Sequence, residues 1–73
     1  MERNLRLNWR LLVEEAIRRR KEQRLSQRRL AAIAGVSQPT VSRFEQQKDD
    51  IQLSSAFAIL HVLGLLEHPP GLH

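Results

Sequence analysis

The sequence contains no cysteine among its 73 residues. Neither a disulfide framework nor a thiolate metal site can therefore supplement its core. Aromatic residues are scarce, with one tryptophan, two phenylalanines and no tyrosine. A chain of this length forms one domain and buries only about 60% of the surface that its unfolded state exposes. Its stability must therefore come from a modest and mostly aliphatic core.

Long apolar runs are also absent. No run approaches the roughly 20 residues needed to cross a bilayer, and no apolar segment of signal-peptide type follows Met1. We therefore expect a cytoplasmic protein without a membrane partner. Proline and glycine occur only three times each, and the polar residues are mainly Arg, Gln, Ser and Glu. This composition favours helix over sheet and predicts an all-α fold.

Positive charge is concentrated in the first part of the chain. Residues 1–30 carry ten basic residues against four acidic ones, a net charge of +6, whereas residues 31–73 carry two against four, a net charge of −2. A polarised basic half suits nucleic acid or an anionic membrane surface. The same charges also suit a solvated helix face, and charge alone favours this second interpretation.

The first predicted helix begins at Asn8, a good N-cap, and ends near Gln23. Its apolar stripe, at helical spacing, consists of Trp9, Leu12, Val13, Ala16 and Ile17. Arg20 lies in line with this stripe, so we expect it to have a buried partner. The run Arg18–Lys21 is either a nucleic-acid patch or an exposed helix end where cations suit the helix dipole, and the second reading is the commoner one.

Two short helices joined by a tight turn follow. Ser26 caps the first of them, which Gly35 ends, and Ser37 caps the second, which has Pro39 in its first turn. The expected inward residues are Leu30, Ala31 and Ala34 in one helix, and Val41 and Phe44 in the other. This layout predicts a helix-turn-helix from about Leu25 to Glu45, with a DNA recognition helix at about 38–46.

A polar loop from Gln46 to Asp50 leads to a strongly apolar fourth helix. Its apolar positions are Leu53, Ala56, Phe57, Leu60, Leu63 and, less regularly, Leu66. Gly64 either ends this helix or separates it from a short fifth turn. We therefore expect a helix-turn-helix DNA-binding domain over 8–66. An N-terminal arm over 1–7, either flexible or dimer-forming, and a C-terminal tail over 67–73 would flank it.

The sequence gives no support to enzyme activity. His61, His68 and His73 lack the spacing and the further ligands of a zinc site. Ser26 and Ser37 are expected to be helix caps, because no histidine is placed to activate either as a nucleophile. We therefore predict no catalytic residue, no metal and no cofactor.

The segment Leu25–Glu45, LSQRRLAAIAGVSQPTVSRFE, resembles the helix-turn-helix of phage-repressor-like proteins of the Cro and lambda repressor type. Its opening Leu-Ser-Gln, its Gly-Val-Ser turn and its Val-Ser-Arg run followed by Glu45 carry the likeness. The fourth helix resembles the closing helices of that family, so the resemblance covers roughly residues 9–66. It implies a compact bundle of four to five short helices that binds double-stranded DNA.

The resemblance also implies roles for individual residues. Base contacts would come from Ser37, Gln38, Pro39, Ser42 and Arg43. Phosphate contacts would come from Ser26, Gln27, Thr40, Gln46 and Lys48. Gln27 would also brace Gln38, the leading base reader, while Arg43 would reach either a guanine or a phosphate. At most Arg24 and Arg28 would add further phosphate contacts. A structural salt bridge would join Arg20 to Glu45 and so supply the buried partner of Arg20.

Two positions depart from the family pattern. Gln47 stands where the family often has glycine, so it is strained if the site needs a positive φ. Pro39 stands where a base-reading residue often lies. Proline cannot donate a hydrogen bond, although it can contact a thymine methyl group. The base preference of other family members therefore does not transfer directly.

Three functions are compatible with the sequence. The first is a transcriptional regulator, a repressor that binds a palindromic operator as a homodimer, through the arm at Leu5–Leu7 or the exposed part of Leu63–Leu66. The second is an antitoxin that neutralises a toxin and represses its own promoter. The third is a protein-interaction module that retains the fold without binding DNA.

Overall fold

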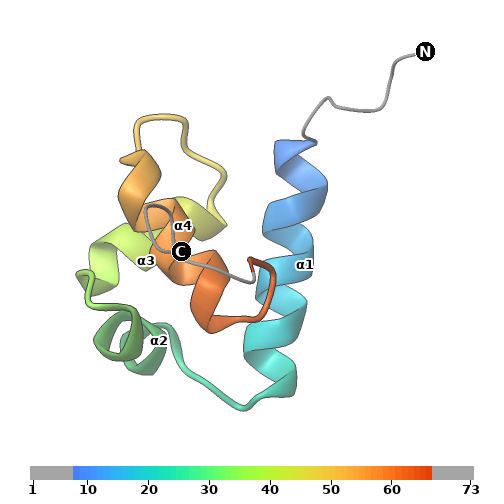
Figure 1. Ribbon diagram of the computed structural model, residues 1–73, viewed down its shortest axis with the longest axis vertical. Coiled ribbons are helices and arrows are strands. Elements are labelled where there is room, and N and C mark those ends of the chain that lie inside the picture. Colours follow the sequence, from blue (N-terminus) through green and yellow to red (C-terminus); the bar gives the residue numbers. More distant parts are fainter. Residues whose placement is uncertain (1–7, 67–73) are drawn as a thin grey trace.

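The computed structural model describes residues 8–66, which form four α-helices and no strand. The helices are α1 (Trp9–Glu22), α2 (Gln27–Ala34), α3 (Gln38–Glu45) and α4 (Leu53–Val62). In Figure 1, α1 runs along one side of the molecule and the other three helices gather beside it. The all-α fold is therefore confirmed. The expected arm at 1–7 and the expected tail at 67–73, with His68 and His73, lie outside the described residues.

Side-chain caps fix the starts of the first three helices. The side chains of Asn8, Ser26 and Ser37 each accept a hydrogen bond from the backbone N–H three residues later, at 3.1, 2.9 and 3.1 Å. Each bond satisfies one of the N–H groups that a helix start leaves unpaired. Pro39 then sits in the first turn of α3, where its missing N–H costs little. The Ser26 and Ser37 caps thus fix where α2 and α3 begin, on either side of the turn between them.

That turn depends on Gly35, which has a φ of 75° in the left-handed region. A Cβ added at Gly35 would meet no heavy atom within 4 Å, so the backbone conformation rather than crowding favours glycine. The N–H of Val36 donates to the carbonyl of Ala31 at 3.0 Å and closes the end of α2. Only Gly35, Val36 and Ser37 separate the two helices.

The core lies where α3 meets the other helices, because α3 packs against α1, α2 and α4. Its fully buried residues come from all four helices and from the turn after α4: Val13, Ala16, Leu30, Ala31, Val41, Phe44, Ala56, Ile59, Leu60 and Leu63. The ring of Phe44 meets that of Trp9 edge to face, with centroids 5.6 Å apart. The contacts of α3 with α1, α2 and α4 fix its orientation, so its outward side chains have defined positions.

The fourth helix ends at Val62, and Gly64 follows with a φ of 79°. No further helical turn forms as far as Leu66, the last described residue. Leu63 caps the helix and is 1% exposed, so it cannot contribute to an exposed dimer surface. The expected dimer surface, the exposed part of Leu63–Leu66, therefore does not include Leu63, because the chain turns this residue into the core after α4.

Candidate nucleic-acid interface

The recognition helix expected from the sequence corresponds to α3, whose two faces differ sharply. Val41 and Phe44 are 0% exposed and anchor one face in the core. On the other side, the side chains of Gln38, Pro39 and Arg43 are exposed. The first turn of α3 therefore presents an amide and a proline ring to solvent, and Arg43 adds a guanidinium further along the helix.

Hydroxyl groups at this end of α3 already have partners within the chain. The Ser37 oxygen accepts from the Thr40 backbone N–H at 3.1 Å and shares a hydrogen bond of 2.7 Å with the Thr40 hydroxyl. Ser26 similarly caps α2. These side chains have structural roles whether or not they contact DNA, so their removal would affect both helix stability and binding.

A further internal bond joins Ser42 to Gln46, which follows the last residue of α3. The amide nitrogen of Gln46 donates to the Ser42 hydroxyl oxygen at 2.9 Å. Ser42 is half-buried and Gln46 is exposed. The bond leaves the hydroxyl hydrogen of Ser42 and the second amide hydrogen of Gln46 able to donate elsewhere.

Glu45 lies at the centre of a polar cluster behind the recognition helix. Its carboxylate accepts from Arg20 Nε at 2.6 Å and from Arg20 Nη2 at 3.1 Å. The third guanidinium nitrogen of Arg20 donates to the Leu25 carbonyl at 2.7 Å. The side chains of Arg20 and Glu45 are only 12% and 8% exposed. This is the pair that the resemblance implies, and it connects α1, α3 and the loop before α2.

Gln27 is held by the same cluster. Its amide nitrogen donates to Glu45 Oε1 at 2.8 Å. The resemblance implies a brace between Gln27 and Gln38, but within residues 8–66 no hydrogen bond joins these two side chains. Glu45 thus orients Gln27 at the start of α2, and the second amide hydrogen of Gln27 remains available to a phosphate oxygen.

The cationic run at the end of α1 is largely engaged within the chain. Arg18 pairs with Glu15 and Glu22, and Arg19 donates to Glu15 at 3.0 Å. Hydrogen bonds from Arg18 and then Arg19 lower the pKa of Glu15 to about 2, and Glu15 in turn raises the pKa of Arg18. Because Arg20 is occupied by Glu45, the interpretation of this run as a nucleic-acid patch loses its support.

Arg19, on α1, also binds the backbone just after α4. Its Nη1 atom donates to the carbonyl oxygens of Leu63 and Gly64 at 3.2 and 3.1 Å. These carbonyls lie just beyond the end of α4, where backbone acceptors lack helical partners. A cation on α1 therefore closes α4, which sequence reasoning did not anticipate.

Exposed cations are found elsewhere: in the loop before α2, in the first turn of α2 and after α3. The side chains of Arg24, Arg28, Arg29 and Lys48 are exposed. Arg24 lies in the loop between α1 and α2 and has a φ of 59°, in the left-handed region. These residues remain available for phosphate oxygens.

Gln47, in the segment after α3, has the positive φ that the sequence analysis named as a source of strain. Gln47 has a φ of 64°, in the region that side chains other than glycine rarely adopt. The backbone N–H of Gln47 donates to the Phe44 carbonyl at 3.0 Å, and that of Lys48 donates to the Arg43 carbonyl at 3.1 Å. The left-handed residue thus closes α3 and positions Lys48 beyond its end.

Sequence reasoning missed one ion pair on the candidate interface. Arg43 donates from Nη2 to the Oδ2 atom of Asp50, and the two side chains are 49% and 60% exposed. The two residues are seven positions apart, beyond helical spacing, so only the path of the loop brings them together. The acidic Asp49-Asp50 pair in the polar loop was the available signal.

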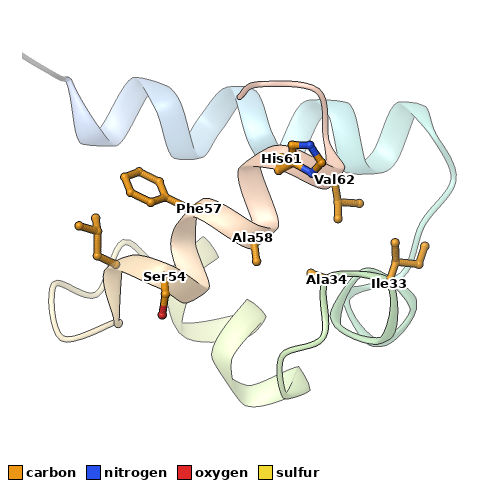
Figure 2. A pocket seen from close by; sticks show the side chains of 8 residues that line it. Ile33, Ala34, Ser54, Phe57, Ala58, His61 and Val62 are labelled. Atoms are coloured by element: carbon orange, nitrogen blue, oxygen red, sulfur yellow. The ribbon is translucent and has the colours of Figure 1, made fainter. Parts of the chain in front are cut away.

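A hollow of about 660 Å³ lies between α2 and α4. Its lining side chains, shown in Figure 2, come from Ile33 and Ala34 on α2 and from Leu53, Ser54, Phe57, Ala58, His61 and Val62 on α4. The lining is mostly apolar and contains no arginine or lysine. It therefore lacks the cationic side chains that usually bind phosphate, in contrast to the exposed surface of α3.

Within residues 8–66, no helix has both the length and the apolar character required to cross a lipid bilayer.

Comparison with protein families places this fold in a known group. The model of the helix-turn-helix family HTH_3 matches residues 17–68, well over half of the chain. Comparisons with curated proteins and with solved structures gave no significant match. The matched range contains α2, the Gly35 turn, α3 and α4. The chain therefore belongs to the helix-turn-helix family of Cro and phage-repressor type, whose members are DNA-binding transcriptional regulators.

Proposed function

We propose that this regulator is a repressor that binds a palindromic operator as a homodimer, through the recognition helix at about 38–46. The observation that carries the proposal is the division of α3 into a core face and a polar outward face. Val41 and Phe44 fix the helix, while Gln38, Pro39 and Arg43 remain exposed at its surface. An α-helix fits the major groove of B-DNA and reads base edges there with its N-terminal residues.

Gln38 is the proposed principal base reader. Its amide is the first side chain of α3 and is exposed, and an amide can bind adenine N6 and N7 together. Pro39, also exposed, would pack on a thymine methyl group. Ser37 and Ser42 would make short contacts beside them, and Arg43 would reach either a guanine base edge or a phosphate further along the groove.

Phosphate contacts would flank the base contacts and fix the register of α3. We assign them to Ser26, Gln27, Thr40, Gln46 and Lys48. Gln27 is oriented by Glu45 at the start of α2, and Lys48 follows α3, so these two groups bracket the helix-turn-helix along the chain. Phosphate contacts supply affinity and position, whereas the side chains on α3 supply sequence information.

The dimer follows from the size of the reading surface. A single recognition helix of eight residues reads only a few base pairs. Two copies related by a twofold axis would read two half-sites about 34 Å apart on one face of the duplex. The resulting area and affinity would approach those of specific regulators.

Selection of bound sequences from a random duplex pool tests the proposal. A repressor of this kind should enrich one motif with twofold symmetry, and sedimentation should show two protomers on each selected duplex. Enrichment of no motif would reject sequence-specific binding. A single protomer per duplex at high protein concentration would reject the dimer.

A further inference from the structure

Arg43 has two possible targets on DNA, a guanine base edge or a phosphate, and its ion pair with Asp50 bears on the choice. The contact uses one guanidinium nitrogen, Nη2. Within residues 8–66, no hydrogen bond to another side chain occupies Nε or Nη1. The guanidinium therefore keeps several N–H donors, while one edge is held by the carboxylate.

The pair does not serve the core. Both side chains are about half exposed, at 49% and 60%, and ion pairs at such sites contribute little to stability. A polar hollow of about 160 Å³ lies beside the pair, lined by Thr40, Arg43, Asp50, Ile51, Gln52 and Ser55. The contact thus lies at the surface between α3 and the start of α4.

The charges between Ser37 and Gln52 bear on which of its two DNA targets Arg43 contacts. Between Ser37 and Gln52 the cations are Arg43 and Lys48, and the acids are Glu45, Asp49 and Asp50. Glu45 is occupied by Arg20 and Gln27. The remaining two cations and two carboxylates cancel, so this segment offers no net charge to the DNA backbone.

We propose that Asp50 is a positioning residue that directs Arg43 to a guanine base edge and away from phosphate. This inference rests on the proposed DNA-binding function and goes beyond it. A phosphate oxygen would compete with the carboxylate for the same cation and would be repelled by it. Guanine O6 and N7 are uncharged acceptors that need two N–H groups, and Arg43 can supply them while Asp50 stays bound.

The D50N substitution tests this role because it keeps the shape of the side chain and removes its charge. Binding of the selected duplex is compared with binding of a duplex changed at the base pair that Arg43 reads, identified as the position relaxed by R43A. Wild-type protein should discriminate between them by about fivefold or more. In D50N this discrimination should fall severalfold, and the salt slope of binding to random duplex should steepen by about one unit, because Arg43 turns to phosphate.

The D49N variant is the matched control. It removes the same charge one residue earlier, and within residues 8–66 no hydrogen bond joins Asp49 to Arg43. D49N should therefore keep the base discrimination of wild type. In the R43A background, D50N should no longer change discrimination. Both variants should melt within a few degrees of wild type, since the pair is exposed.

Two results would overturn the inference. If D50N discriminates as well as D49N, Asp50 acts only through its general charge, and the DNA-binding proposal stands without it. If R43A relaxes no base position although wild-type protein selects a motif, Arg43 binds phosphate and Asp50 does not direct it to a base. Selection of no motif by wild-type protein would instead reject the proposed function, and this inference with it.

Discussion

Arg20 Nε lies 2.6 Å from Glu45 Oε2, and this contact joins the last turn of α1 to the last residue of α3. The side chains are 12% and 8% exposed, so both charges lie largely out of solvent. The net contribution of such a pair to stability is small, because desolvation offsets the attraction. Its importance is structural: each charge needs the other, and Glu45 also orients Gln27.

The E45A substitution should strongly destabilise the domain. It leaves the guanidinium of Arg20 buried without a counter-ion, which costs about 3–5 kcal/mol of unfolding free energy. For a domain of this size, the thermal midpoint should fall by more than about 10 °C. Thermal unfolding followed by circular dichroism measures the change.

Glu22 provides the control for E45A. It pairs with Arg18 at 2.8 Å, but the two side chains are 64% and 56% exposed. E22A should therefore cost less than about 1 kcal/mol. An E45A midpoint within about 2 °C of wild type would contradict the account of the buried pair.

The Q47G substitution should stabilise the domain. Gln47 has a φ of 64°, and relief of left-handed strain outweighs the greater freedom of glycine in the unfolded chain. We expect the free energy of unfolding, measured by chemical denaturation, to rise by about 0.5–1 kcal/mol. The neighbouring Gln46 has a φ of −82°, so Q46G should destabilise instead. A loss of stability in Q47G would show that the side chain of Gln47 has a role that outweighs its strain.

Glu15 should make the stability of the domain depend on acid pH. Hydrogen bonds from Arg18 and Arg19 lower its pKa from 4.5 to about 2 in the folded chain. A lowered pKa means that ionised Glu15 stabilises the fold above pH 4.5, and that this contribution disappears as the pH falls towards 2. Because the carboxylate is solvent-accessible, salt should weaken the effect.

The measurement compares the thermal midpoints of wild type and E15Q across the acid range. Wild type should be the more stable at neutral pH, and the difference should shrink below pH 4.5 and vanish near pH 2. E14Q makes the same charge change one residue earlier on α1 and corrects for the general effect of charge. A difference between wild type and E15Q that stays constant with pH would contradict the assignment.

Local chemistry made much of this fold predictable. Asn8, Ser26 and Ser37 are caps because of hydrogen bonds that span three residues, and Gly35 ends α2 because of its own backbone freedom. The inward positions of Val41 and Phe44 follow from helical spacing. Such features depend on neighbours in the sequence, so residue types and intervals were sufficient to predict them.

Contacts across the fold were less predictable from the residues alone. Arg19 reaches the carbonyls of Leu63 and Gly64, more than forty positions away, only because α1 passes the end of α4. Asp50 meets Arg43 because of the path of the intervening loop. The buried Arg20–Glu45 pair was anticipated through the family resemblance, since periodicity showed only that Arg20 needed a partner.

The central claim is that α3 reads bases, and parallel selections with Q38A and K48A test it most directly. Gln38 is proposed to contact a base and Lys48 a phosphate, and both are exposed. Q38A should relax the enriched motif at one base pair in each half-site, at a cost of about 1–3 kcal/mol. K48A should keep the motif, weaken all sequences alike and lower the salt slope by about one. An unchanged motif in Q38A, or no motif with wild-type protein, would contradict the account.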